Sequence, residues 1–305
     1  MPRVNSVRGR LLSAVMVTST GSRVPAPVLF VVGGVSMYVG AALAVGLFAV
    51  LAPTVVALLR LMGAAAVLLA WRRPGRAAWR GGRLLRAAAF GCATALMNVA
   101  FYEAIARLPL GTAVAIEFCG PVLVAAVASR RPRDVAAVVL AAVGVLLIAD
   151  VRWSGSPSGV LWALGAAAMW ALYILLGRRV ASAGNGLDDM AVGFAVAAAV
   201  LSPLLLVGGV APLSALVDPL LLLLAVGVGV LSSVVPYVLD QLVLRRVGQA
   251  RFAVLLALLP ATATVVGLVA LAQVPGALEA LGIAAVVAAV GLRSRDGDPP
   301  RAHGL

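Results

Sequence analysis

Two residues of opposite charge, Arg60 and Glu117, lie within segments of the sequence that are otherwise apolar. An ionised side chain near the centre of a lipid bilayer costs about 2.5–3.5 kcal/mol on insertion scales, and such residues commonly have a function. A guanidinium binds a carboxylate through two hydrogen bonds, whereas a carboxylate holds an ammonium group or a proton. We therefore expect Arg60 and Glu117 to form the two ends of a site for a zwitterion. A structural ion pair between them is the alternative.

Polar and aromatic side chains in other apolar segments are the next candidates for such a site. Asn98, Ser232, Ser233 and Tyr237 could line a cavity or could hydrogen-bond a neighbouring helix. Aromatic side chains could form cavity walls, although packing is their more common role in a helix. The predicted substrate-binding or proton-coupling site takes in Arg60, Glu117, Asn98, Tyr38, Trp170, Tyr173, Ser233 and Tyr237.

Two prolines, Pro121 and Pro260, interrupt apolar segments that occupy equivalent places in the two halves of the chain. A proline within a helix frees a backbone carbonyl and permits a kink, which helps a helix to rock or to expose a polar group. Gly120 should loosen the first of these segments further. We predict that Gly120, Pro121 and Pro260 form a kink or gate.

Two further acidic residues lie near the ends of apolar segments. Asp240 is followed by Arg245 and Arg246, so it could form a gate ion pair or simply anchor a helix end. Glu103 and Arg107 are four residues apart, which favours a solvated surface pair over a functional site.

The residue types exclude several classes of chemistry. The only histidine is His303, and Cys92 and Cys119 lie in separate apolar segments, so we expect no metal site and no cofactor. The chain has no lysine, which excludes a P-loop and a Schiff base. An intramembrane protease would need a buried histidine or paired aspartates. The arginines cluster in short loops, which indicates membrane topology and not nucleic-acid binding.

The elements that position these residues must be membrane helices. The chain has 305 residues, of which 63% are hydrophobic and 11% are charged, and its mean hydropathy is +1.10. In lipid, only helices and closed barrels satisfy every backbone polar group. The apolar segments are long and lack the alternation of a barrel strand, so we predict an all-α integral membrane protein.

Ten segments are apolar and long enough to be predicted as transmembrane helices. They are 27–48, 52–71, 84–106, 110–129, 134–150, 158–177, 189–209, 217–243, 250–272 and 276–292. Residues 1–26 and 293–305 are predicted to be cytoplasmic tails. With the N-terminus inside, 21 of the 24 arginines lie on the inner side and two lie in outer loops, so both termini are predicted to be cytoplasmic.

The two halves of the chain, 27–150 and 157–292, resemble each other weakly. Gly33 matches Gly165, and Pro121 matches Pro260. Since each half contains five predicted helices, the second half must enter the membrane in the opposite orientation. Inverted repeats of this kind are typical of secondary transporters, whose site lies between the repeats.

Three segments, FYEAIARLPLGTAVAIEFCGP, WALYILLGRR and SSVVPYVLDQLVLRRV, resemble EamA-type ten-helix exporters of the drug/metabolite transporter superfamily. The resemblance is greatest to members that export threonine and homoserine. It implies a plasma-membrane secondary transporter that exports amino acids or related metabolites, driven by proton antiport. The implied partners are a small-molecule substrate, protons and the lipid bilayer.

The chain departs from the pattern of that family in its second half. Leu259 occupies a position before a proline where the family often has Glu, and Asp240 occupies another position where Glu is common. Export of cationic or aromatic drugs is therefore an alternative, although Arg60 would repel a purely cationic substrate. An intramembrane enzyme is the less favoured alternative. The sequence does not define the oligomeric state.

Overall fold

The computed structural model describes residues 24–128, 132–153, 156–181, 186–206, 218–256 and 258–293, and these residues are almost entirely helical. The predicted tails, 1–26 and 293–305, lie almost wholly outside the described residues. The first half contains α2 (Ala26–Leu47), α3 (Pro53–Arg72), η2 (Arg76–Trp79), α4 (Gly81–Ile105), α5 (Leu110–Glu117), α6 (Cys119–Ala128) and α7 (Pro132–Trp153). The second half contains α8 (Pro157–Ala181), α9 (Gly186–Leu201), η3 (Ser202–Leu206), α11 (Pro219–Gly229), η4 (Val230–Val234), α12 (Val235–Leu256), α13 (Leu258–Leu271) and α14 (Ala277–Arg293).

Each of the ten predicted apolar segments coincides with helical structure, and the prediction of an all-α membrane protein is confirmed. Among the described residues, six helices are long and apolar enough to cross a membrane. Shorter apolar helices occupy the remaining predicted segments. The positions of the helices therefore agree with the prediction of ten membrane spans. Six of these ten helices are long enough by themselves to cross a membrane.

One predicted boundary was wrong, and two predicted helices contain an internal irregularity. The predicted helix 110–129 is divided at Phe118, because Pro121 has no N–H to donate to the carbonyl of Glu117. The predicted helix 217–243 contains a π-helical segment, η4. α12 continues through 244–249, which the polar sequence there had suggested to be a loop. That stretch contains no proline and one glycine, so nothing in the backbone ends the helix.

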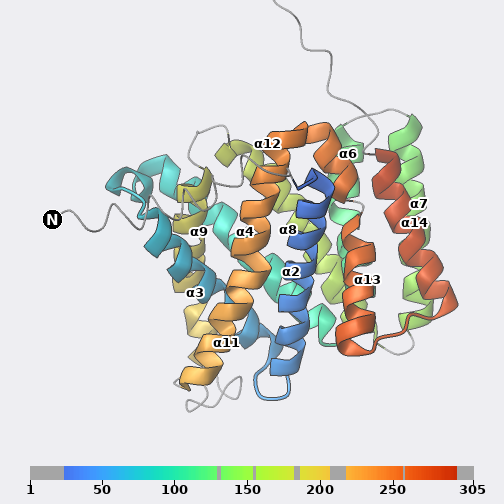
Figure 1. The fold of residues 1–305 in the computed structure, drawn as a ribbon, viewed down its shortest axis with the longest axis horizontal. Coiled ribbons are helices and arrows are strands. Elements are labelled where there is room, and N and C mark those ends of the chain that lie inside the picture. The colour runs from blue at the N-terminus through green and yellow to red at the C-terminus, as the bar shows by residue number, and fades with distance from the viewer. Residues whose placement is uncertain are drawn as a thin grey trace, which may run out of the picture.

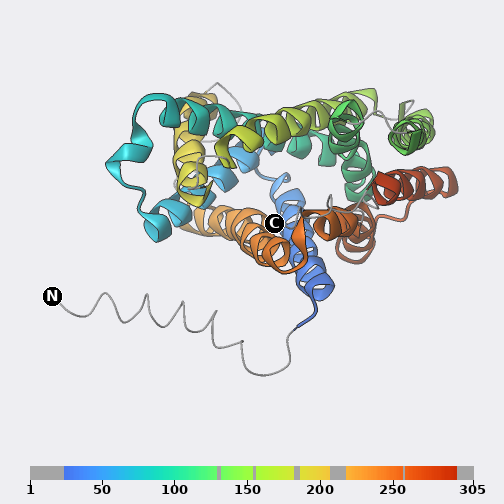
Figure 2. The same cartoon turned by 90° about the horizontal axis from the view of Figure 1, so that it is seen from above.

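The helices are arranged in two layers, which Figure 1 shows from the side and Figure 2 from above. In Figure 2, α4 and α8 lie along one layer, and α12, α2 and α13 lie along the other. α3 and α9 pack together near one end of the molecule, and α7 packs against α14 near the other. The two layers enclose the site described below.

Close approach between helices depends on glycine at several crossings, and at two of them the glycines of both helices face each other. A Cβ atom added to Gly91 of α4 would collide with the backbone of Gly193 in α9, and a Cβ added to Gly193 would collide with the carbonyl of Ala87. Gly144 of α7 and Gly282 of α14 approach each other in the same reciprocal way, each with its added Cβ 2.7 Å from the other's carbonyl oxygen. Without hydrophobic driving force between helices in lipid, such close backbone packing stabilises the assembly.

We expect Gly91→Ala and Gly193→Ala each to lower the stability of the purified protein by about 1–3 kcal/mol, because the helices must separate to admit a methyl group. Gly46→Ala is the control, since a Cβ there meets nothing within 4 Å and α2 should gain slightly in helix propensity. Thermal unfolding in detergent measures the difference. Equal melting temperatures for all three variants would contradict the proposed close packing.

Candidate functional site

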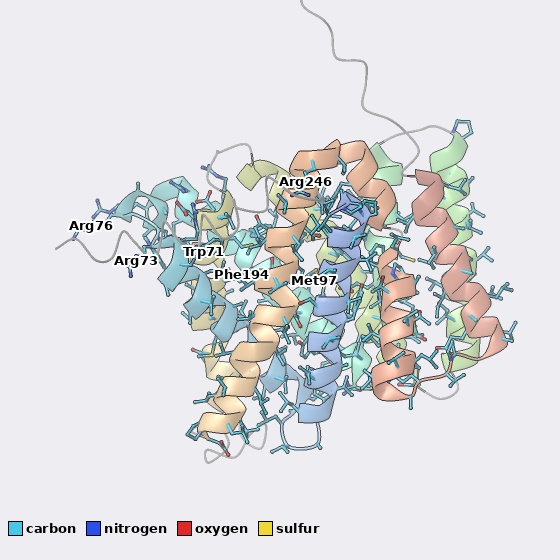
Figure 3. All side chains as sticks on the ribbon, in the orientation of Figure 1. Trp71, Arg73, Arg76, Met97, Phe194 and Arg246 are labelled. Atoms are coloured by element: carbon cyan, nitrogen blue, oxygen red, sulfur yellow. The ribbon has the colours of Figure 1, made fainter. Side chains whose placement is uncertain are left out.

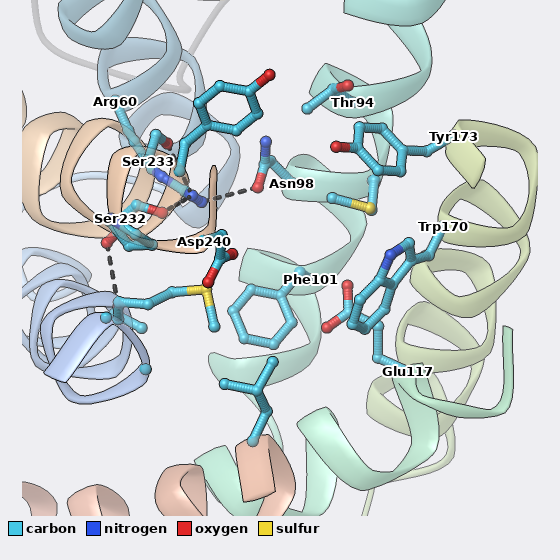
Figure 4. Close-up of a pocket in the computed structure, with 18 of the residues that line it drawn as sticks. Arg60, Thr94, Asn98, Phe101, Glu117, Trp170, Tyr173, Ser232, Ser233 and Asp240 are labelled. Carbon is cyan, nitrogen blue, oxygen red and sulfur yellow. Dashed lines mark hydrogen bonds between the residues drawn. The ribbon is translucent and has the colours of Figure 1, made fainter. Parts of the chain in front are cut away.

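A cavity of about 220 Å³ lies between the two layers of helices. All eight residues predicted from the sequence to bind substrate or protons line it, and so does Asp240. They come from seven separate elements, α2, α3, α4, α5, α8, η4 and α12 (Figure 4). Other lining side chains include Phe90, Thr94, Met97, Phe101, Met190, Phe194 and Ser232. The structure therefore brings the widely spaced sequence candidates to one place.

Arg60 of α3 is buried at the edge of this cavity, with 8% of its surface exposed. Its Nη1 donates a hydrogen bond to Oδ1 of Asn98 at 2.8 Å. Its Nη2 donates to the carbonyl oxygen of Ser232 at 2.9 Å and to the hydroxyl of Ser233 at 3.1 Å. The guanidinium also lies 5.3 Å from the centre of the Tyr102 ring. These neutral partners hold the side chain in one position.

The carbonyl of Ser232 is available to Arg60 for a reason that is visible in the sequence. In a regular helix this carbonyl would accept a hydrogen bond from the residue four positions later, which is Pro236 and has no N–H. The same proline follows the π-helical turn of η4, in which the N–H of Val235 bonds to the carbonyl of Val230. The site predicted from the sequence included the side chain of Ser233 but not the free carbonyl of Ser232.

Among the described residues, Arg60 has no acidic partner, and its buried Nε has no hydrogen-bond acceptor. Transfer of a charge from water into a protein interior is costly unless the charge is paired. The dipoles of Asn98, Ser232 and Ser233 orient the guanidinium without neutralising it. The arrangement can therefore receive an anion such as a carboxylate.

Glu117 lies on the opposite side of the cavity from Arg60 (Figure 4). The ion pair considered as an alternative is not formed in this conformation, since none of the ion pairs within the described residues joins the two. Glu117 is the last residue of α5 and is 8% exposed. Among the described residues, no side chain forms an ion pair with its carboxylate, which leaves it able to hold an ammonium group or a proton.

Asp240 of α12 adds a second carboxylate to the cavity. Arg246, one of its two predicted partners, instead donates to the carbonyl of Val24 at 3.2 Å. The side chain of the other, Arg245, lies outside the described residues. Among the described residues, the lining of the cavity thus includes one guanidinium and two carboxyl groups. A role for Asp240 in a gate stays a prediction.

The three residues predicted to form a kink lie outside the lining of the cavity. Pro121 follows the break between α5 and α6, and Pro260 is the third residue of α13. A Cβ added to Gly120 would collide with the carbonyl of Ala167. Gly120 therefore allows α6 to pack closely against α8, a role that its sequence context did not indicate.

Glu103 was expected on a solvated surface, but the structure buries it. Its pairing with Arg107 is present, at 2.5 Å between Nη1 and Oε2. Its other oxygen accepts hydrogen bonds from the N–H of Thr54 at 3.2 Å and from the Thr54 hydroxyl at 2.6 Å. Thr54 lies in the first turn of α3, where a carboxylate is favoured by the unpaired N–H groups and the helix dipole. Glu103 thus ties α4 to the start of α3.

A second polar contact on the same side of the molecule joins the two halves of the chain. The side chain of Gln273 accepts a hydrogen bond from the N–H of Leu110 at 2.8 Å, and the hydroxyl of Thr112 donates to the fully buried Glu279. Sequence reasoning missed Glu279, although it occupies the first turn of α14, where an acid is favourable. These contacts hold the two halves of the chain together beside the turns at 106–109 and 272–276.

Comparison with known proteins reveals relatives along most of the chain. The model of a family described as the EamA-like transporter family matches residues 157–295. The threonine/homoserine exporter RhtA of Salmonella typhimurium (strain LT2) is 37% identical over 257 residues, which cover 83% of this chain and 86% of that protein. RhtA of Escherichia coli (strain K12) is 35% identical over 265 residues, covering 86% and 88%. A crystal structure with 21% identity has a TM-score of 0.57 and covers 89% of this chain and 96% of the other, which shows a shared fold.

Proposed function

Because the chain belongs to the EamA-like transporter family, a family of membrane transporters and not of enzymes, we propose that it exports small amino acids in exchange for protons. The two RhtA relatives carry the name threonine/homoserine exporter, so these two amino acids are the first substrates to test. The plasma membrane is the proposed location, as expected for an exporter of metabolites.

The observation that carries this proposal is the buried, unneutralised guanidinium of Arg60 at the cavity. A positive charge held in place by Asn98, Ser232 and Ser233 would repel a cationic drug and would not help to bind it. An amino acid would gain a charge-assisted contact for its carboxylate, since guanidinium and carboxylate geometries match. The ammonium group would then be held by Glu117 on the opposite side.

Exchange with protons follows from competition at Glu117. Its carboxylate can hold the substrate's ammonium group or a proton, and one occupant excludes the other. A proton that enters from outside would release the ammonium group there, and substrate that binds from inside would require the proton to leave. Asp240 is a second candidate for the proton, because it faces the same cavity.

The packing pattern supports inverted repeats and alternating access. α2 packs against α12 and α13, and α8, its proposed counterpart, packs against α4, α5 and α6. α3 and α9, like α7 and α14, are proposed counterparts that pack against each other. A transporter of this class opens by rocking one repeat against the other around a central site. In this conformation the contacts of Glu103 and Glu279 would hold the outer side shut.

The alternative is export of cationic or aromatic drugs, favoured by the aromatic walls of the cavity. Phe90 and Tyr173 have ring centroids 4.7 Å apart, and Trp170 packs edge-on against Phe118 at 4.6 Å. The rings of Phe90, Trp170 and Tyr173 line the cavity and could accept a flat apolar substrate, but they also pack against other aromatic rings as ordinary core residues do.

A competition assay in proteoliposomes distinguishes the two substrate classes. Radiolabelled threonine is loaded inside, and its efflux is measured with an inward proton gradient and after the gradient is collapsed. Unlabelled homoserine should compete, whereas the amino alcohol that lacks the carboxylate and the hydroxy acid that lacks the ammonium group should compete weakly. Competition by cationic dyes but by no amino acid would overturn the proposal in favour of drug export.

The proposed topology makes a separate prediction about accessibility. In a variant whose native cysteines, Cys92 and Cys119, are replaced by alanine, single cysteines at Arg152 and Pro212 should react with an impermeant thiol reagent added to intact cells. A cysteine at Gly75 should react only after the cells are permeabilised, because the arginine-rich loops are retained inside. Labelling at position 75 in intact cells would contradict the model with both termini inside.

A further inference from the structure

The segment that joins α3 to α4 carries an unusual concentration of positive charge. Six arginines lie between residues 72 and 86, and the segment includes the short helix η2. Figure 2 shows this part of the chain at one end of the molecule, beyond the neighbouring helices. We call residues 71–86 the α3–α4 segment.

Two of these arginines are neutralised within the protein, and four are not. Arg72 pairs with Asp188 at 2.9 Å, and Arg83 pairs with Asp189 at 2.6 Å. The other four are exposed and have no acidic partner among the described residues: Arg73, Arg76, Arg80 and Arg86. The Nε of Arg73 donates to the carbonyl of Ala70 in the last turn of α3, at 3.3 Å. The exposed surface of the α3–α4 segment therefore carries four positive charges that no described acidic residue neutralises.

Apolar side chains accompany these charges. Trp71 is 47% exposed, Trp79 is 38% exposed and Leu85 is 72% exposed. Figure 3 shows Trp71, Arg73 and Arg76 together at the edge of the molecule. Tryptophan favours the boundary between hydrocarbon and headgroups, where an apolar ring and a polar N–H are both satisfied.

The length of α3 places the segment at the depth of the headgroups. Twelve residues separate Arg60 from Arg72, which corresponds to about 18 Å along a helix. Half of the hydrocarbon core is about 15 Å thick, so a cavity near mid-membrane puts Arg72 just beyond the hydrocarbon boundary. The segment would then meet the phosphate groups of the lipids, with Leu85 available to contact acyl chains.

The segment is also held in a defined shape, which favours specific binding over a loose electrostatic attraction. The ion pairs to Asp188 and Asp189 fasten both of its ends to α9, and Ala78 of η2 is buried. We propose that the α3–α4 segment is a binding site for anionic phospholipid headgroups of the inner leaflet, such as phosphatidylglycerol. Guanidinium groups bind phosphate oxygens in pairs, and basic clusters beside membrane helices attract anionic lipids.

Binding at this place would act on the transport site through the two helices that the segment joins. α3 carries Arg60 and α4 carries Asn98, and these two side chains are hydrogen-bonded. A lipid that fixes the end of both helices would restrict their relative motion. The proposal stands independently of which substrate the cavity takes.

The experiment uses the full chain, purified in a neutral detergent, with thermal unfolding followed as lipid is added. Phosphatidylglycerol should raise the melting temperature of the wild type, and zwitterionic phosphatidylcholine should have a much smaller effect. The variant with Arg73, Arg76, Arg80 and Arg86 replaced by glutamine should bind phosphatidylglycerol at least about tenfold more weakly.

The matched control replaces the four arginines of the N-terminal tail, Arg3, Arg8, Arg10 and Arg23, by glutamine, which changes the net charge by the same amount. This control should keep the response to phosphatidylglycerol. Equal losses in both variants would overturn the proposal, because net charge alone would explain the effect. Inorganic phosphate is added separately, and stabilisation by phosphate equal to that by the lipid would mean that the site binds the free anion and not a membrane lipid.

Discussion

Export of threonine should fall at least about 100-fold when Arg60 is replaced by glutamine, because the substrate's carboxylate would lose the only guanidinium among the described residues that line the cavity. Arg60→Lys should recover little of this loss, since an ammonium group cannot reproduce the planar contacts to Asn98, Ser232 and Ser233. Initial rates of efflux from proteoliposomes, at matched amounts of inserted protein, measure the effect.

The control for that prediction is Arg246→Gln, which removes an exposed arginine outside the cavity lining. It should leave efflux near the wild-type rate. Because Arg60→Gln also removes a donor from three acceptors, its melting temperature must be measured alongside transport. Rapid efflux of threonine by a folded Arg60→Gln protein would show that the carboxylate binds elsewhere.

The second prediction separates proton coupling from substrate binding. Glu117→Gln should abolish efflux driven by a proton gradient, since glutamine cannot take up or release a proton. The variant should still exchange internal for external threonine with no gradient, because a neutral amide oxygen can accept a hydrogen bond from the ammonium group. Glu117→Asp should restore part of the gradient-driven rate. Full gradient-driven efflux by Glu117→Gln would reduce Glu117 to a structural role.

The relative position of these two residues also predicts how their substitutions combine in their effect on the stability of the folded protein. Because Arg60 and Glu117 form no ion pair here, the double variant Arg60→Gln/Glu117→Gln should be no more stable than either single variant. A double variant that is more stable than either single one would show that the two charges do pair in the resting protein, since removing both partners strands neither.

The alternation of long apolar segments with arginine-rich connections determined the all-α membrane architecture from the sequence alone. These are local properties, because a segment's length and polarity decide whether it can lie in lipid, whatever its neighbours are. For the same reason Arg60, Glu117 and Asp240 could be singled out early: the cost of a charge in an apolar segment does not depend on the fold. Pro236 carried a further local signal, the free carbonyl of Ser232, which was overlooked.

Which polar side chains meet was decided only by the tertiary structure. Hydropathy does not determine how each helix is rotated about its own axis, and that rotation depends on side-chain packing such as that of Gly91 on Gly193. The packing directs Arg60 toward Asn98 and Ser232 and leaves Glu117 across the cavity, although sequence alone allowed a direct pair. It likewise buries Glu103 against Thr54, because a neighbouring helix end supplies the N–H groups that make burial of a carboxylate favourable.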